Sequence, residues 1–292
     1  MSAPAVATVI KLGEPAYPAL LKEIADPPKQ LYVWGDVNSL SGDVMIAIVG
    51  TRKPTDYGIR VAGRLSADLG VSATVVSGLA YGVDTVALTE AVAMGAKTVA
   101  VIGSGLDRES FYPAVNYQLA EKIVAGGGAV ISEYIDGTPP LKQNFPARNR
   151  IIAGLTLGTI VVEGLKGSGA LITAEHAMEF GREVWAVPGN IFVPEAWAPN
   201  QLIKEGATPV TAASDIWESL GLGVQLNLSD VAAETSSIED KINQLLNLQS
   251  LSIDEIAREL QLDSQLVSST LTLMEIQGLV KLTPAGNFAR LR

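Results

Sequence analysis

The sequence predicts an α/β protein with a doubly wound, mostly parallel sheet and a small separate C-terminal domain. Two observations support this prediction. Short apolar runs alternate with amphipathic helical patterns over the first 220 residues, and a polar stretch then precedes a second set of short helical patterns. Alternation of strands and helices is typical of parallel sheets with right-handed connections, and the polar stretch indicates a linker between domains.

The first strand and helix illustrate the pattern. Val44–Gly50 is an apolar run that ends in glycine, which indicates a strand buried on both faces. Asp56–Leu69 has apolar residues at helical spacing and stops at Gly70, which indicates an amphipathic helix. The further predicted strands are Thr74–Ser77, Thr98–Ile102, Ala129–Ser132, Thr159–Val162 and Glu183–Val187. The further predicted helices are Val83–Met94, Val115–Ala125, Asn149–Leu155, Ala170–Phe180 and Gln201–Glu205.

Unusual residues gather in the turns that follow these strands. Ligands of parallel sheets bind beyond the carboxyl ends of the strands, where such turns meet. Ordinary turn chemistry accounts for the glycines, but it does not explain an arginine at position 52 in the first turn. We therefore expect an anion-binding face. The residues predicted to form its pocket turns are Ser77, Gly78, Gly82, Asp84, Gly103, Gly105 and Glu163.

A cationic and aromatic group precedes the fifth strand. It comprises Lys142, Phe145, Arg148, Asn149 and Arg150. The stretch from Gly137 to Val162 contains no acidic residue, although the chain carries a formal net charge of −10. Guanidinium groups bind phosphates, an aromatic ring stacks on a base, and an amide bonds to either, so this combination indicates a nucleic-acid strand as ligand.

A second anion site is predicted directly after the fifth strand. Gly167, Ser168 and Gly169 open the next helix, and the free backbone N–H groups of a helix start favour an anion. Each of the two sites by itself also fits ordinary surface structure, with solvated arginines and a simple turn. Their combination on either side of one buried strand favours a dedicated binding face.

Composition excludes several classes of function. The chain has no cysteine and one histidine, His176, so thiolate catalysis, cysteine metal sites and most histidine-based catalytic schemes are excluded. We expect no metal, no cofactor and no catalytic residue. Neither a dinucleotide fingerprint nor a Walker motif occurs. The sequence shows no membrane-spanning run and no secretory signal, so we expect a cytoplasmic protein.

The motifs together resemble those of the DNA-processing protein A family, also called DprA or Smf. The resembling segments run in one order from about Tyr17 to Leu220 and include VGTRKPTDYG, VSGLAYGVD, FPARNRIIAGL, SGALITA and NQLIKEGA. The resemblance implies an extended Rossmann-like domain that binds single-stranded DNA, a homodimer, and loading of the recombinase RecA during natural transformation. It also implies a protein without enzymatic turnover.

The resemblance assigns DNA contacts to particular positions of this chain. Departures from the family pattern are Leu88, where the family has histidine, Pro199, where it has glycine, and a threonine for serine in the first turn. Few residues precede Tyr17, so the helical domain that many relatives carry there is not expected. The residues implied to contact DNA are Thr51, Arg52, Lys142, Phe145, Arg148, Asn149, Arg150, Ser168, Gly169 and Thr173.

The chain is expected to divide into an N-terminal segment (1–40), the Rossmann-like domain (41–220), a linker (221–237) and a winged-helix-like domain (238–292). The last domain combines predicted helices with a predicted hairpin, and Ser252 with Glu255 fits a capping box. Its last helix contains no Lys or Arg, which favours contact with protein over contact with duplex DNA. Its predicted elements are Ile238–Leu246, Ser252–Leu260, Asp263–Gln277, Leu279–Leu282 and Asn287–Leu291.

We therefore expect a single-stranded DNA-binding recombination mediator. Two alternatives stay open: an enzyme similar to nucleoside-monophosphate phosphoribohydrolases, with Glu163 as a catalytic carboxylate, and a nucleotide-sensing module. If Arg52, Lys142, Arg148 and Arg150 each contact a phosphate, log K should fall against log salt with a slope of about −3, from roughly −0.7 per contact.

Overall fold

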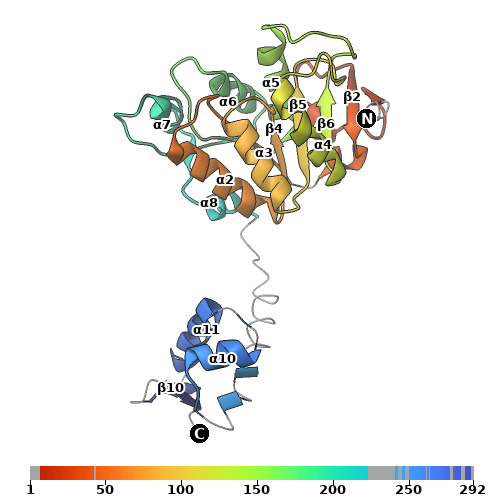
Figure 1. Ribbon diagram of the computed structural model, residues 1–292. Helices are drawn as coiled ribbons and strands as arrows, with labels where there is room; N and C mark the ends of the chain where they lie inside the picture. The colour runs from red at the N-terminus through yellow and green to blue at the C-terminus, as the bar shows by residue number, and fades with distance from the viewer. Residues whose placement is uncertain are drawn as a thin grey trace. The chain divides into compact units, whose positions relative to one another are not determined.

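The computed structural model describes residues 7–42, 44–222, 241–242, 245–246, 250–260, 262, 264–276, 279–283 and 287–290. The chain divides into two compact units, Met1–Gly221 and Leu222–Arg292, which are described separately. The first unit is a sheet with helices on both faces (Figure 1). Among the described residues, none of the helices has the length and apolar character that a membrane span requires.

The sheet has nine strands in the order β1-β2-β6-β5-β4-β3-β7-β8-β9. Strands β3 to β9 pair in parallel, while β1 and β2 form an antiparallel edge. The strands are β1 Thr8–Lys11, β2 Gln30–Gly35, β3 Met45–Val49, β4 Thr74–Ser77, β5 Thr98–Ile102, β6 Ala129–Ser132, β7 Gly158–Val161, β8 Glu183–Ala186 and β9 Thr208–Pro209. The predicted doubly wound, mostly parallel sheet is confirmed.

The winding direction of the sheet reverses at β3. The chain proceeds from β3 through β4 and β5 to β6 on one side, then crosses back to place β7 on the other side of β3. At such a reversal the flanking connections leave the sheet on opposite faces, so a crevice opens beyond the carboxyl ends of the two strands. The crevice between β3 and β7 is therefore the expected ligand site of this fold.

Helices cover both faces of the sheet. Figure 1 shows α2, α3 and α4 side by side across one face, and α8 packs beside α2. The buried clusters place α1, α5, α6 and α7 on the opposite face. The helices are α1 Ala19–Lys22, α2 Asp56–Gly70, α3 Val83–Ala93, α4 Tyr117–Ala125, α5 Asn144–Leu155, α6 Gly169–Glu179, α7 Trp197–Lys204 and α8 Ala213–Ser219.

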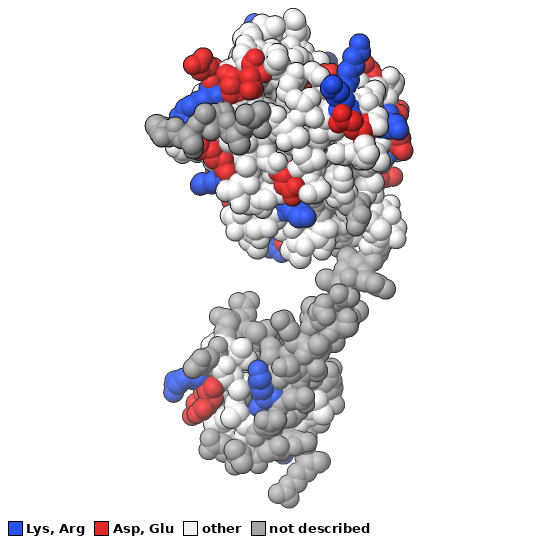
Figure 2. Space-filling model, turned by 90° about the vertical axis from the view of Figure 1, so that its right-hand side faces the viewer, with Lys and Arg blue, Asp and Glu red and all other residues white. Residues whose placement is uncertain are grey.

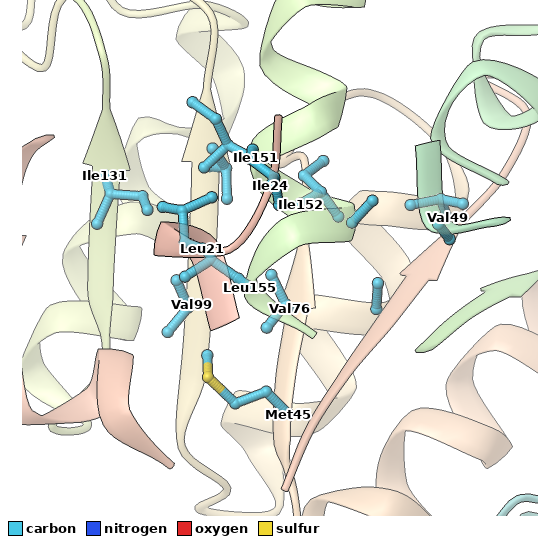
Figure 3. Packing of buried hydrophobic residues seen from close by; sticks show 14 of the residues in the cluster. Leu21, Ile24, Met45, Val49, Val76, Val99, Ile131, Ile151, Ile152 and Leu155 are labelled. Carbon is cyan, nitrogen blue, oxygen red and sulfur yellow. The ribbon is translucent and has the colours of Figure 1, made fainter. Parts of the chain in front are cut away.

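Helix α5, which makes the crossover from β6 to β7, packs tightly on the sheet and on the N-terminal segment. Ile151, Ile152 and Leu155 of α5 meet Leu21 and Ile24 above the strands (Figure 3). A Cβ at position 154 would lie 2.8 Å from Leu21 Cδ1, so glycine is required for this close approach. The apolar packing fixes the position of the helix that carries the cationic group.

Two helices start earlier than the sequence predicted. Helix α5 begins at Asn144 instead of Asn149, and α7 begins at Trp197 instead of Gln201. In both cases a proline, Pro146 or Pro199, occupies the first turn of the helix. A first-turn residue has no intrahelical acceptor for its N–H and therefore tolerates proline, so each helix includes a proline that lies before its predicted start.

The second unit contains α10 (Ile253–Leu260), α11 (Ser264–Ile276) and an antiparallel pair of β10 (Val280–Leu282) with β11 (Phe288–Arg290). The predicted capping box is confirmed, because Glu255 Oε2 accepts from Ser252 N at 2.8 Å and Glu255 N donates to Ser252 Oγ at 3.4 Å. The predicted linker and most of the predicted helix Ile238–Leu246 lie outside the described residues.

Gly158 of β7 lies so close to Trp185 of β8 that adding a methyl group at position 158 should destabilise the fold. A Cβ at position 158 would lie 2.4 Å from Trp185 Cζ3, and this indole is fully buried. We expect Gly158→Ala to lower the free energy of unfolding by about 1–3 kcal/mol through overpacking. Gly126→Ala, on an exposed helix end with 3.3 Å to its nearest atom, is the matched control. Chemical denaturation that shows equal losses for both variants would contradict this account.

Candidate functional site

A cleft of about 780 Å³ opens at the crevice between β3 and β7. The turn after β3, helix α5 and the start of α6 contribute its walls. Every residue predicted to contact DNA lines this cleft except Arg150. The lining residues are Thr51, Arg52, Lys142, Phe145, Arg148, Asn149, Ser168, Gly169 and Thr173. The fold therefore joins three segments that are far apart in the sequence.

The turn that carries Thr51 and Arg52 is held by the turn before α3. Val83 N donates to Thr51 O at 3.1 Å, and Ser77 Oγ donates to Ile48 O at 2.6 Å. Gly82 has a φ of +78°, and a Cβ there would lie 2.4 Å from Thr51 O. Only glycine combines this backbone conformation with so close an approach. The predicted pocket residues Ser77 and Gly82 thus support the cleft from behind.

Arg148 lies beneath the cleft and is only 4% exposed. Its Nη1 donates to Gly78 O at 2.5 Å and also to Val101 O. Burial lowers the pKa of Arg148 to about 10, and the neighbouring Asp84 carboxylate opposes this shift. Burial raises the pKa of Asp84, and Arg148 opposes that shift in turn. The sequence predicted that Arg148 contacts a phosphate. In the structure its guanidinium group instead donates hydrogen bonds to carbonyl groups of the protein.

The side chain of Arg150, also on α5, is likewise bonded to groups within the protein. Its Nη2 donates to Glu133 Oε1 at 2.8 Å and to Oε2 at 3.0 Å, and its Nε lies 3.4 Å from Asp26 Oδ2. The side chain is 13% exposed and does not line the cleft. Arg150 therefore ties α5 to the turn after β6 and to the N-terminal segment, where the sequence predicted a DNA contact.

Three exposed cations line the cleft: Arg52, Lys142 and Lys166. On the face drawn in Figure 2, the Lys and Arg side chains of the described residues occur in small groups beside Asp and Glu. The cleft differs from this mixed surface, because the acidic residue in its lining, Asp84, is buried beside Arg148. Lys166 was not predicted, although it stands in the turn between β7 and α6.

A row of aromatic rings begins in the cleft, which Phe145 and Tyr112 line, and continues to Tyr81. Arg52 Cζ lies 5.5 Å from the centroid of the Phe145 ring, which indicates a cation–π contact. The Phe145 ring meets Tyr112 edge-on at 5.5 Å, and Tyr112 meets Tyr81 edge-on at 6.2 Å. Tyr112 and Tyr81 were not predicted as site residues. The signal for them was an aromatic residue within a turn that follows a parallel strand.

Helix α6 begins inside the cleft. Ser168 precedes its first residue, and the Ser168 Oγ is buried without a hydrogen-bond partner. A Cβ at Gly169 would meet no atom within 4 Å, so the helix start is open. Asn149 Nδ2 donates to Gly169 O at 3.0 Å and connects α5 to this turn. The free first-turn N–H groups at this open helix start form an anion cradle.

The remaining predicted pocket residues do not line this cleft. Gly103 O accepts from Asn144 Nδ2 at 3.1 Å, and Gly105 N donates to Thr138 O at 3.0 Å. Glu163 is 2% exposed and accepts from Thr55 N at 2.8 Å and Thr55 Oγ1 at 2.5 Å. It lines a separate cavity of about 630 Å³. These residues shape the turns around the cleft.

Comparison with known families gives matches over both units. Residues 8–221 match the family described as DNA recombination-mediator protein A, and residues 228–286 match the DprA winged helix domain. The chain is 43% identical to DNA processing protein DprA of Bacillus subtilis over 212 residues. This aligned region covers 72% of the present chain and 70% of the Bacillus protein. Protein Smf of Synechocystis is 44% identical, covering 71% of this chain and about half (52%) of the relative.

Two solved structures extend the comparison. DNA processing protein A of Streptococcus pneumoniae is 41% identical with a TM-score of 0.68, covering 73% of this chain and 74% of that chain. DNA processing protein A of Helicobacter pylori, described as having a unique single-stranded DNA binding mode, is 29% identical with a TM-score of 0.64. The aligned region covers 73% of the present chain and 96% of the Helicobacter pylori chain. The predicted Rossmann-like and winged-helix-like fold class is confirmed.

Removal of Arg148 tests its buried role. We expect Arg148→Met to lower the free energy of unfolding by about 3–5 kcal/mol at neutral pH, because the buried Asp84 carboxyl group then lacks the nearby cation that favours its charged form. Without Arg148 the pKa of Asp84 rises further above the ordinary 3.8. The folded state then binds a proton that the unfolded state releases, so the loss shrinks as pH falls through this raised pKa.

Arg64→Met is the matched control for this experiment, since Arg64 forms an exposed ion pair with Asp68 on α2. We expect nearly unchanged stability for the control, because exposed pairs contribute little. Denaturation curves recorded from neutral to acidic pH provide the measurement. A loss for Arg148→Met that stays constant over this range would contradict the pairing with Asp84.

Proposed function

The chain belongs to the DNA recombination-mediator protein A family, and we propose that its cleft between β3 and β7 binds single-stranded DNA. The observation that supports this most directly is the composition of the cleft. Exposed cations, an aromatic row and an open helix start share one surface. Phosphates bind cations and backbone N–H groups, whereas bases stack on aromatic rings, so the cleft provides for both parts of a nucleotide.

Within this proposal each wall of the cleft has a role. Arg52 and Lys142 bind phosphates on the side of Phe145, while Lys166 and the start of α6 bind them on the other side. Phe145 stacks on a base, and Tyr112 supports the ring by its edge-on contact. Asn149 and Thr173 orient the first turn of α6, since Asn149 Nδ2 and Thr173 Oγ1 both donate to Gly169 O.

Family membership also supports the wider role. We propose that the chain binds single-stranded DNA and loads a RecA-type recombinase onto incoming DNA during natural transformation. We propose further that the chain acts as a homodimer in the cytoplasm. The prediction that it is not an enzyme agrees with membership in this family of DNA-binding recombination mediators.

The enzymatic alternative depended on Glu163 as a catalytic carboxylate. In the structure Thr55 donates to both oxygens of this carboxylate, and Glu163 does not line the cleft that holds the cationic and aromatic residues. Glu163 instead fixes the start of α2: a Cβ at Gly58 would lie within 2.2 Å of its Oε2. The structure of this turn favours a positioning role and disfavours the enzyme.

The Phe145 ring tests the stacking role. We expect Phe145→Ala to weaken binding of a short single strand by about 1–3 kcal/mol, the usual contribution of one base–aromatic stack. The ring is partly exposed at the cleft, so the thermal melt should change little. Phe192→Ala is the control, because Phe192 is 87% exposed and does not line the cleft. Equal affinities of both variants and the wild type would refute stacking on Phe145.

Salt dependence tests the phosphate contacts. With Arg52, Lys142 and Lys166 as the exposed cations of the cleft, log K for a single strand should fall against log salt with a slope of about −2, from roughly −0.7 per contact. This is smaller than the slope expected from the sequence, because Arg148 and Arg150 are engaged within the protein. Titrations with single-stranded DNA, duplex DNA and free nucleotides at several salt concentrations provide the measurement.

The matched variants for this titration are Lys142→Gln in the cleft and Lys122→Gln on α4. Lys142→Gln should reduce the slope by about one contact, roughly 0.7, while Lys122→Gln should leave it unchanged. Equal affinity for duplex and single strand, or a slope near zero, would rule out the proposed site.

A further inference from the structure

A second cation–aromatic pair lies next to the cleft, and its aromatic member, Trp197, takes no part in the DNA contacts proposed for the cleft. Lys166 Nζ lies 5.8 Å from the centroid of the Trp197 ring, within the range of a cation–π contact. Lys166 lines the cleft, whereas Trp197 is the first residue of α7 and does not line it. Trp197 is 39% exposed, which is unusual for the largest apolar side chain.

Backbone contacts fix Trp197 to the wall of the cleft. Gly164 N donates to Glu195 O at 2.6 Å, and Ala198 N donates to Gly164 O at 2.8 Å. A Cβ at Gly164 would lie 3.0 Å from Ala198 Cβ and 2.6 Å from Ser168 Oγ. The start of α7 therefore packs directly on the turn that leads into α6. Trp197 is held at a fixed position beside Lys166 and the anion cradle.

The chemistry of this pair repeats that of the first one. At Phe145, an aromatic ring is paired with the exposed cation Arg52 at 5.5 Å. At Trp197, an indole is paired with the exposed cation Lys166 at a similar distance. The two pairs come from different walls of the cleft, α5 with the β3 turn and α7 with the β7 turn. Phe145, Arg52 and Lys166 line the same cleft, so one strand can contact members of both pairs.

We propose that Trp197 and Lys166 form an additional nucleotide subsite, so that the single strand leaves the cleft over α7. One base stacks on the indole, and the adjacent phosphate contacts the ammonium group of Lys166. This inference rests on the proposed function of the cleft. A cation beside the ring favours a nucleotide over a purely apolar partner, because the ammonium group supplies the phosphate contact that a base-stacking site needs.

The subsite predicts a dependence on strand length. We expect the affinity of the full chain for oligothymidylates of about 4 to 16 nucleotides to rise until both pairs are covered. Trp197→Ala should weaken binding of the long oligomers about tenfold, which corresponds to 1.4 kcal/mol, and leave the shortest ones unaffected. Phe145→Ala should weaken binding at every length. The contrast between these variants separates the subsite from the cleft itself.

Fluorescence provides an independent readout. Trp34 and Trp185 are buried, so stacking of a base on Trp197 should quench a distinct part of the tryptophan emission. Trp197→Phe should abolish this quenching while it preserves an aromatic surface and the fold. Trp217→Phe, a change in a partly buried residue of α8, is the matched control and should retain the quenching.

The results of these experiments distinguish failure of the Trp197 subsite from failure of DNA binding by the cleft. If Phe145→Ala weakens binding but Trp197→Ala does not at any length, and wild-type emission is not quenched, the subsite is refuted while the cleft stands. If the wild-type chain binds single-stranded and duplex DNA equally, or with no dependence on salt, the proposed function itself fails. Ile191 and Phe192, 81% and 87% exposed, precede α7 in the chain. A change in molecular mass in solution for Trp197→Ala, without a change in affinity, would also refute the subsite and assign this surface to protein contact.

Discussion

The buried guanidinium of Arg148 is the interaction on which the cleft depends. It connects α5 to the carbonyl groups of Gly78 and Val101, at the ends of β4 and β5, and it faces the buried carboxylate of Asp84 at the start of α3. Taking both charges out of water is costly, and breaking such a pair costs more because the remaining charge is left unpaired. The pair therefore fixes where α5 can lie, and with it the position of Phe145, Asn149 and the first turn of α6.

The arginines and lysines of this region divide between two tasks. Arg148 and Arg150 are enclosed and bonded to protein groups, although the buried Nε of Arg148 has no partner, so they position the helix. Arg52, Lys142 and Lys166 are exposed at the cleft and free to meet phosphates in the described structure. This division also explains how a chain with a net charge of −10 can bind a polyanion. Charges farther away than the Debye length of about 8 Å are largely screened at physiological salt. The electrostatic attraction of a phosphate to the cleft therefore depends mainly on the cations that line it.

Stacking and phosphate contacts suit a protein that must accept strands of any sequence. Every base has a π-face and every nucleotide a phosphate, so a cleft built from rings, cations and a helix start discriminates little between bases. We expect it to prefer single strands to double strands, because the bases of a duplex are already stacked and paired. The proposed Trp197 subsite would be equally tolerant of sequence, because any base can stack on the indole and any phosphate can contact Lys166.

The sequence alone determined the six parallel strands β3 to β8, because buried parallel strands such as Met45–Val49 leave continuous apolar runs and their helices leave a separate periodicity. It did not identify β1, β2 and β9 at the edges of the sheet. It also located the segments that line the cleft, and nine of the ten residues predicted to contact DNA lie there, since cations, aromatic residues and glycines in βα turns form a local pattern. It did not determine the roles of Arg148 and Arg150, because burial and ion pairing depend on Asp84, Glu133 and Asp26, which are distant in the chain. Nor did it find the approach of Trp197 to Lys166, since only the tertiary structure brings two segments together when neither carries a local signal for the contact.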